Sequence, residues 1–196
     1  GMGENLDVRF TRPLAQMDQQ AERMESLLKD LLWLSRIESV RSETKTEQVD
    51  VAAMLKELKE EISKGFPGRD IEVHCETGES VLGDFRELHS AASNLVINAL
   101  KYSQAGGKVF VRWRREDDEL LLSVQDEGVG IDPVHIPRLT ERFYRVDDSR
   151  SSTTGGTGLG LAIVKHVAAA HDADLRIDSR LGEGSTFTLA FRRVAD

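Results

Sequence analysis

Two asparagines, Asn94 and Asn98, stand four residues apart in the stretch covering residues 88–103, where apolar residues recur at helical spacing. Residues four apart share one face of a helix. A buried amide without a partner costs about 1 to 3 kcal/mol, so two amides on one face indicate either a bound polar ligand or the capping of a neighbouring loop. Three later glycine-bearing segments, DEGVGI, GGTGLGLAI and GEGSTF, favour the ligand.

Asp126 opens the first of these segments, at the expected end of an apolar strand and just before Glu127-Gly128-Val129-Gly130. A carboxylate at this position can accept a hydrogen bond from an exocyclic amine, and the glycines allow the backbone to approach a ligand closely. The pattern alone is weak, because Asp-x-Gly-x-Gly also describes many ordinary turns.

The second segment, GGTGLGLAI, is a stronger signal. Its glycines at positions 155, 156, 158 and 160 lead directly into an apolar helix. Free backbone N–H groups and the positive end of that helix can face a polyphosphate. The segment is not a P-loop, because the Lys-Ser/Thr ending is absent, and a dinucleotide-binding fold would require a preceding strand.

The composition is that of an ordinary globular chain of 196 residues, with 39% hydrophobic and 31% charged residues. A net charge of -8 argues against a surface that binds nucleic acid as a whole. The single cysteine, Cys75, is expected on a strand and excludes an internal disulfide or a cysteine metal cluster. No run approaches ~20 apolar residues, although a membrane anchor upstream is not excluded. Gly1-Met2-Gly3 resembles a cloning remnant, which predicts a fragment of a longer protein.

Residues 14–37 are predicted to form one helix of about 25 residues, with Pro13 in its first turn. Its stripe of apolar residues needs partner helices, from upstream sequence or a second copy, or else it is an ordinary core helix. The stripe consists of Leu14, Met17, Ala21, Met24, Leu28 and Leu31, widened by Leu27, Leu34 and Ile37.

Polar residues 39–46 predict a linker, with a domain boundary near Glu43. Beyond it we expect a short strand at 46–51, a helix from residue 51 to about 64 and a strand at 71–76. Asp84 is the expected N-cap of the central helix. Hairpins at 108–127 and 173–193 then flank a short helical segment at 133–139 and a helix at 159–170. This order lacks a strict βαβ rhythm and predicts an α+β fold, a mixed sheet with helices on one face.

Five motifs in this order, NLVINALKYS, DEGVGI, RFYR, GGTGLGLAI and GEGSTF, resemble the N, G1, F, G2 and G3 boxes of sensor histidine kinases. The resemblance covers roughly residues 49–193 and implies the two-layer, Bergerat-type ATP-binding fold of that family. LLKDLLWLSRIES, at the end of the first helix, is similar to the second helix of the family's dimerisation and phosphoacceptor hairpin. HIPRLTERFYRVD and VKHVAAAH are most similar to the phosphate-regulon sensor kinases.

The resemblance implies a role for each matching residue in binding ATP and Mg²⁺. Asn98 matches the Mg²⁺-binding asparagine, and an amide oxygen suits a cation that otherwise keeps water and phosphate ligands. Asp126 matches the residue that reads adenine, and Tyr102 matches the ring beside the base. The remaining matches line the pocket, contact phosphate or shape the mobile lid between 143 and 158: Asn94, Lys101, Arg145, Gly128, Gly130, Gly156, Gly158, Leu159 and Gly160.

Simpler explanations remain open for the two cations among these residues. Lys101 can be merely solvated, and Arg145 can pair with Asp147 or Asp148.

The family's phosphoacceptor histidine belongs to the first helix of the hairpin, and residues 1–73 contain no histidine. We therefore expect residues 1–43 to be a partial dimerisation region and 44–196 the catalytic ATP-binding domain, with no catalytic residue beyond the ATP site. The implied partners are a response-regulator receiver domain and, in the full-length protein, a second copy. The implied setting is the cytoplasmic part of a membrane-anchored bacterial kinase, attached through segments outside these residues.

Related ATPases and an anti-sigma-type serine kinase are the competing functions. The ATPases carry a water-activating glutamate four residues before the Mg²⁺ asparagine, and here that position is Asn94, which cannot accept a proton at neutral pH. The long first helix disfavours the serine kinase, and the intact glycine boxes disfavour a degenerate scaffold module.

Overall fold

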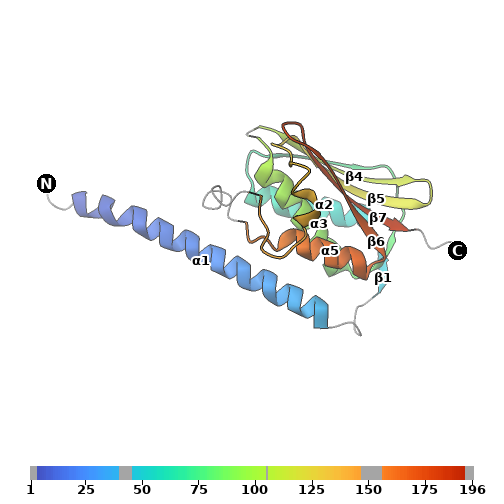
Figure 1. Ribbon diagram of the computed structural model, residues 1–196, viewed down its shortest axis with the longest axis horizontal. Helices are drawn as coiled ribbons and strands as arrows, with labels where there is room; N and C mark the ends of the chain where they lie inside the picture. The colour runs from blue at the N-terminus through green and yellow to red at the C-terminus, as the bar shows by residue number, and fades with distance from the viewer. Residues whose placement is uncertain (1–3, 40–45, 105, 147–155, 193–196) are drawn as a thin grey trace.

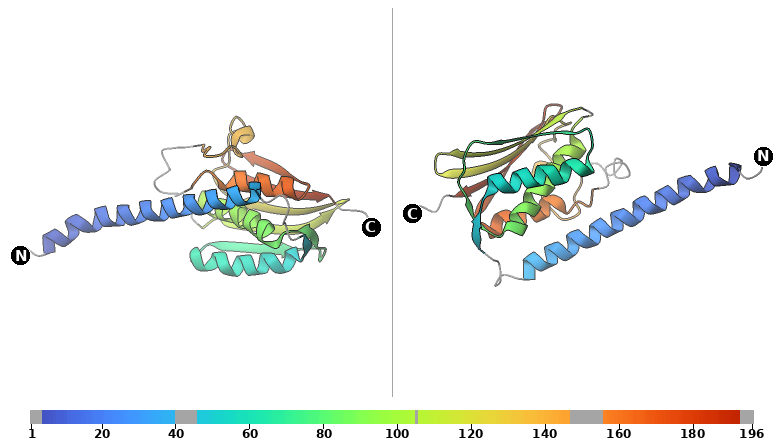
Figure 2. Two further views of the ribbon diagram at one scale, coloured as in Figure 1. Left: turned by 90° about the horizontal axis from the view of Figure 1, so that it is seen from below. Right: turned by 180° about the vertical axis from the view of Figure 1, so that it is seen from behind.

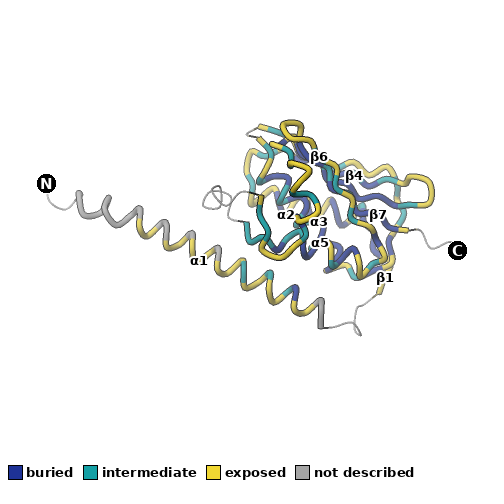
Figure 3. The backbone as a smooth tube through the Cα atoms, in the orientation of Figure 1, coloured by how far each residue is buried: buried dark blue, intermediate teal, exposed yellow. Residues whose placement is uncertain are grey.

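A computed structural model of the chain shows a long helix, α1, lying against a two-layer α/β body (Figure 1). The structure describes residues 4–39, 46–104, 106–146 and 156–192. The body has a sheet in one layer and helices in the other, and its dark-blue core lies between the two layers (Figure 3). This arrangement confirms the predicted α+β fold class.

The main sheet has five strands in the order β2-β4-β5-β7-β6. β2 pairs in parallel with β4, and the other three pairings are antiparallel, so the sheet is mixed as predicted. Cys75 is the last residue of β2 and is exposed. The bounds are β2 Asp70–Cys75, β4 Lys108–Glu116, β5 Glu119–Asp126, β6 Ala173–Arg180 and β7 Gly184–Arg192.

Three helices cover one face of this sheet: α2 Val51–Gly65, α3 Phe85–Tyr102 and α5 Gly160–Ala170 (Figure 2). Between α3 and α5, the short 3₁₀ helix η1 Ile136–Arg138 confirms the expected helical segment. α2, α3 and α5 each begin within about one residue of the predicted start. On α2, Val51, Met54, Leu55, Leu58 and Ile62 are buried at the spacing of a single helix face.

The central helix α3 begins where its capping residue dictates. The Asp84 carboxylate accepts hydrogen bonds from the backbone N–H groups of Arg86, at 2.8 Å, and Glu87, at 3.3 Å. Leu95 and Ala91 are fully buried on the side that faces the core. Because the helix start and the buried face are both fixed, the orientation of the opposite, polar face is fixed as well.

A second, two-stranded sheet pairs β1 Glu47–Val49 with β3 Val81–Gly83. The sequence predicted β1 but not β3, whose three residues are too few for a period-2 pattern to be recognised. The domain boundary near Glu43 lies outside the described residues and stays a prediction.

The first helix, α1 Glu4–Ser39, is longer than predicted, and Pro13 lies inside it rather than in its first turn. A proline within a helix removes one backbone hydrogen bond, which is why the sequence placed the helix start there. Nine residues nevertheless precede Pro13 in the helix. Neither α1 nor any other helix of the described residues is sufficiently long and apolar to cross a membrane.

The apolar stripe of α1 is divided between two faces. Leu27 and Trp33 pack against the core of the body, and Leu34 is only 3% exposed. By contrast, a second set of apolar side chains on α1 is exposed, and most of α1 in Figure 3 is coloured accordingly. These are Leu14, Met17, Met24, Leu28, Leu31 and Leu32.

Candidate functional site

Asp126 lies at the end of β5, between β4 on one side and β7 on the other, opposite Val109 and Ser185. It is 4% exposed, and its Oδ1 accepts a hydrogen bond from the Gly128 N–H at 2.9 Å. Burial raises the pKa of Asp126 from 3.8 to about 6, against the lowering effect of the Gly128 and Ser185 backbone N–H groups. The result is a fixed, largely desolvated carboxyl group that can still accept a hydrogen bond at neutral pH.

Gly128 brings the end of α3 next to this carboxyl group. A Cβ at position 128 would meet the Tyr102 carbonyl oxygen at 2.4 Å and the Asp126 Oδ1 at 2.5 Å, so only glycine fits. Tyr102 is 45% exposed at the end of α3, beside this contact. Gly130 instead faces the Arg180 carbonyl oxygen at the turn between β6 and β7. The structure therefore brings Tyr102, Asp126 and Gly128 together and places Gly130 just behind them.

Asn94 and Asn98 both face the beginning of α5, as their shared helix face predicts. A Cβ on Gly160 would lie 2.7 Å from the Asn94 Oδ1 and 3.7 Å from the Asn98 Nδ2. The absence of a side chain at Gly160 therefore allows α3 and α5 to approach closely at this point. The Asn94 Nδ2 donates a hydrogen bond to the Ser90 carbonyl oxygen at 2.9 Å.

Asn98 offers a side-chain oxygen of the kind that a Mg²⁺ ion bound together with a nucleotide would need from the protein. Its amide makes no hydrogen bond to any residue that the structure describes, so its oxygen is available. Among the residues that the structure describes, no three His, Cys, Asp or Glu side chains cluster in a way that could hold a metal ion. Mg²⁺ commonly uses one or two protein ligands and completes its shell with water and phosphate, so a single amide oxygen fits this cation.

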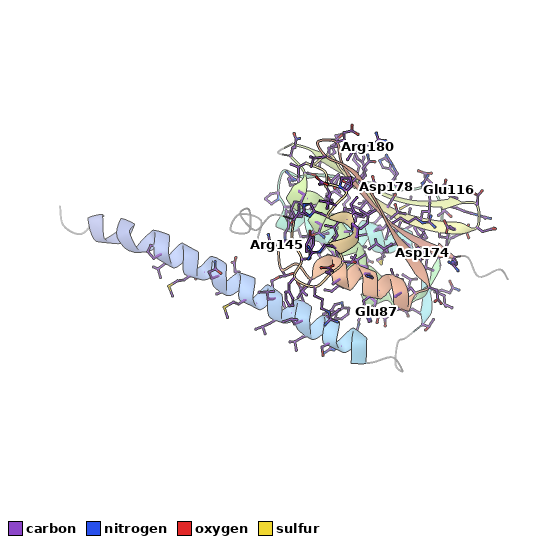
Figure 4. All side chains as sticks on the ribbon, in the orientation of Figure 1. Glu87, Glu116, Arg145, Asp174, Asp178 and Arg180 are labelled. Carbon is purple, nitrogen blue, oxygen red and sulfur yellow. The ribbon has the colours of Figure 1, made fainter. Side chains whose placement is uncertain are left out.

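Lys101 and Arg145 both lie near the beginning of α5, where cations for phosphate were predicted. Arg145 donates a hydrogen bond to the Gly156 carbonyl oxygen. Figure 4 shows Arg145 and Glu87 near opposite ends of α5. Burial lowers the pKa of Lys101, Asp30 acts to raise it, and Arg145 acts to lower it. The alternative pairing of Arg145 with Asp147 or Asp148 falls outside the described residues.

The segment that leads into α5 is held by backbone contacts. Phe143 donates a backbone hydrogen bond to the Gly158 carbonyl oxygen at 2.9 Å. The Leu159 side chain is fully buried in the core, so only its backbone can contribute to a ligand site. The predicted role of Leu159 in the ligand site is therefore limited to its backbone. Thr157 Oγ1 accepts a hydrogen bond from the Leu159 N–H at 3.3 Å.

Two residues of this region, Asp30 and Thr157, were not identified from the sequence. Thr157 Oγ1 donates a hydrogen bond to Asp30 Oδ2 at 2.7 Å, which connects α1 to the glycine segment. The residues are 127 positions apart, and no local pattern indicates such a contact. In the sequence, Asp30 does not differ from the other acidic residues of α1, such as Asp18 and Glu25.

A cavity of about 430 Å³ lies apart from these residues, between η1, α5 and β6. Its lining is mostly apolar and includes none of the predicted site residues. The arrangement of Asp126, Asn94 and Asn98 therefore identifies the candidate site on chemical grounds, and the cavity is a separate feature of the surface.

Comparison with known proteins agrees with the fold. Residues 83–195 match the family model described as histidine kinase-, DNA gyrase B-, and HSP90-like ATPase. The chain is 48% identical over 190 residues to the phosphate regulon sensor protein PhoR of Pseudomonas aeruginosa. That match covers 96% of this chain but 43% of the relative, so the chain spans less than half the length of this relative.

Two solved structures extend this similarity to three dimensions. The mycobacterial sensor histidine kinase MprB is 31% identical, with a TM-score of 0.67, over 76% of this chain and 99% of that chain. Full-length ShkA in complex with AMPPNP is 25% identical, with a TM-score of 0.73, over 100% of this chain and 40% of that chain. The similarity to ShkA extends over α1 as well as the α/β body.

Proposed function

Since the chain belongs to the family of histidine kinase-, DNA gyrase B- and HSP90-like ATPases, we propose that it is the Mg-ATP-binding catalytic part of a sensor histidine kinase. The whole protein transfers the γ-phosphoryl group of ATP to a histidine outside these residues, and then to an aspartate of a response regulator. The identity with PhoR supports phosphate sensing as the signal. The similarity to ShkA, a structure that holds AMPPNP, supports the nucleotide.

The observation that carries this proposal is that α3 connects two groups of polar side chains. Gly128 brings the last residue of α3, Tyr102, against Asp126, and Asn94 and Asn98 of the same helix face Gly160 at the beginning of α5. The Asp126 carboxylate accepts a hydrogen bond from the adenine amine and so discriminates against bases that present a carbonyl there. Tyr102 lies beside the base. Because Gly128 brings the backbone close to the same carboxylate, the base is held by fixed groups.

Where α3 meets the beginning of α5, Asn98 supplies the protein ligand for Mg²⁺, and Lys101, Arg145 and the N-terminus of α5 attract the phosphates. The bound Mg²⁺ neutralises charge on the phosphates. Phosphoryl transfer depends mainly on such positioning and electrostatic stabilisation, so the chain needs no covalent catalysis of its own. Asn94, which occupies the position of the ATPase glutamate, does not activate water, and the phosphoryl group is kept for the histidine.

The exposed apolar side chains of α1 provide the surface for the remaining helices of a dimeric hairpin. Met17, Met24, Leu28 and Leu32 are exposed on α1, and the helix gains stability when other helices cover these side chains. The homodimer of the full-length protein is accordingly part of the proposal. Sedimentation of this chain at increasing concentration tests it, and a strictly monomeric chain with an ordered α1 would contradict it.

The first experiment is a calorimetric titration of the chain with Mg-ATP, followed long enough to detect continuing heat of hydrolysis. We expect saturable binding without sustained heat. The chain is then mixed with [γ-³²P]ATP and a separately produced phosphoacceptor hairpin from a related kinase, with a hairpin lacking the histidine as the control. Acid-labile label on the histidine-bearing hairpin alone supports the proposal. Sustained heat without transfer would instead favour an ATPase.

A further inference from the structure

The contact between α1 and the body lies directly over the phosphate end of the candidate site. Leu34 is buried there, Leu27 and Trp33 pack against the core, and α1 contacts α5. Figure 2 shows the C-terminal part of α1 passing over the helix layer, on the side away from the sheet. The nucleotide site and the packing surface for α1 are therefore neighbours.

A single carboxylate of α1 reaches into this region. Asp30 Oδ2 accepts the 2.7 Å hydrogen bond from Thr157, which stands between Gly156 and Gly158 in the segment leading into α5. Asp30 is also close enough to Lys101 to raise its pKa against the effect of burial. The carboxylate thus interacts with one cation and with the glycine segment, the two features that are expected to attract phosphate.

The docked position of α1 also contains an unfavourable element. The indole Nε1 of Trp33 is buried, and no hydrogen-bond acceptor for it exists among the described parts of the chain. A buried donor without a partner regains its hydrogen bond when it is exposed to water. The packing of Leu34 stabilises the docked helix, while the unpaired indole N–H lowers the free energy needed to release it.

We propose that Asp30 is an intramolecular competitor for the phosphate groups of the nucleotide, so that docking of α1 and binding of Mg-ATP oppose each other. This inference rests on the nucleotide site proposed above. The negative charge of Asp30 occupies the surroundings of Lys101 and Thr157 while α1 is docked. A nucleotide with more phosphate charge is opposed more strongly, so ATP is opposed more than ADP, and adenosine is not affected. By reciprocity, Mg-ATP weakens the docking of α1 by the same factor.

Asp30→Asn separates charge from hydrogen bonding, because an asparagine oxygen can still accept the hydrogen bond from Thr157. Asp18→Asn is the matched control, with the same change of charge on an exposed position of α1. The dissociation constants of Mg-ATP, Mg-ADP and adenosine are measured by calorimetry for the two variants and the unchanged chain. We expect Asp30→Asn to bind Mg-ATP more tightly by on the order of fivefold and Mg-ADP by less, with adenosine and the control unchanged.

The position of α1 is followed through acrylamide quenching of tryptophan fluorescence. Trp113 is 0% exposed in the core, so the change in quenching reports Trp33. We expect Mg-ATP to increase quenching in the unchanged chain and adenosine not to do so. In Asp30→Asn the increase caused by Mg-ATP becomes smaller.

Three results separate the possible failures. Unchanged Mg-ATP affinity in Asp30→Asn would overturn the inference while leaving the nucleotide site in place. An equal gain in affinity for adenosine in Asp30→Asn would also overturn the inference, because the substitution would then act through the shape of the site rather than through its charge. If neither the unchanged chain nor Asp30→Asn binds Mg-ATP, the proposed function fails and the inference fails with it.

Discussion

The two ends of the candidate site are built in different ways. Asp126 is held between two neighbouring strands and is almost completely buried, and its hydrogen bond comes from the adjacent Gly128 backbone. At the phosphate end, Lys101 and Arg145 are only half-buried, and Thr157 is hydrogen-bonded to Asp30 of α1.

We expect this structural difference to correspond to two different roles in nucleotide binding. A group fixed by the sheet needs no rearrangement when a ligand arrives, so in the proposed site we expect the base end to determine which nucleotide binds and to supply most of the affinity. The contacts at the phosphate end must be exchanged for contacts with the nucleotide, which lets the rest of the protein influence the site there. Substitutions at the base end are therefore expected to have larger effects than those at the phosphate end.

The largest effect is expected from Asp126→Ala, which removes the acceptor for the adenine amine. A hydrogen bond to a charged group contributes about 1.5 to 3 kcal/mol, so Mg-ATP affinity falls on the order of 10- to 100-fold. Titration calorimetry measures the affinity, and Mg-GTP is the comparison because the preference for ATP should disappear. We expect the melting temperature to change by about 4 °C or less, since only local hydrogen bonds of the carboxylate are lost. Equal binding of Mg-ATP by the variant would remove Asp126 from the site.

A smaller loss is expected from Asn98→Ala, because the nucleotide and water supply the other Mg²⁺ ligands. The variant should keep its fold and lose about tenfold in ATP affinity when Mg²⁺ is present. Titrations with and without EDTA separate the metal from the nucleotide. If the loss is the same under both conditions, Asn98 contributes to packing between α3 and α5 rather than to the metal.

The pH dependence of Mg-ATP binding tests the charge of Asp126 at the base end without a substitution that would alter the shape of the site. The pKa of Asp126 is raised from 3.8 to about 6, so near pH 5 only about a tenth of the folded molecules carry the ionised carboxylate. An ionised carboxylate accepts the hydrogen bond of the adenine amine more strongly than a protonated carboxyl group does, so Mg-ATP affinity is expected to fall several-fold between pH 7 and pH 5. Asp126→Asn does not titrate and corrects for protonation of the phosphates. Parallel pH profiles for the two proteins would contradict the raised pKa.

The same pKa determines the sign of the effect on folding. Between pH 3.8 and about 6 the folded protein holds a proton that the unfolded chain has released. The contribution of Asp126 to the free energy of unfolding is therefore fully present below the lower value and is lost as the pH rises through the upper one. Urea unfolding of the chain without nucleotide measures this contribution, again relative to Asp126→Asn.

The base end was also the part that could be predicted from sequence. Asp126 follows an alternating strand and precedes two glycines, and Asp84 stands one residue before a helical repeat, so short-range patterns were sufficient. The motifs assigned Asn94 and Gly160 to the same site. That a Cβ at position 160 would stand only 2.7 Å from the Asn94 Oδ1 became visible only when α3 and α5 were placed together.

The phosphate end and α1 were predicted less completely, because their contacts are long-range. The periodicity of α1 indicated a helix that needs partners, but periodicity does not distinguish a partner helix from the protein's own body. Leu27 and Leu34 were assigned to the same stripe as Leu28, yet they pack on the body while Leu28 is 58% exposed. The preference of proline for the first turn of a helix also led to a predicted start of α1 at Pro13, which is too late.

The smallest effect is expected from Leu34→Ala, which acts on the phosphate end only through the docking of α1. Loss of a buried leucine side chain weakens packing by about 2 to 5 kcal/mol, and here it favours the undocked helix. Mg-ATP affinity should rise about two- to threefold, because the apparent affinity increases with the fraction of molecules that can bind. Leu28→Ala is the control, since Leu28 is on the exposed face of the same helix.

The double variant Asp30→Asn/Leu34→Ala decides whether the two residues act through one equilibrium. If Asp30 opposes the nucleotide only while α1 is docked, undocking leaves nothing further for its replacement to relieve. The gain in Mg-ATP affinity of the double variant should then be no larger than that of Asp30→Asn alone. Additive gains would mean that Asp30 acts on the nucleotide independently of the helix position, and the phosphate end would then be as rigidly built as the base end.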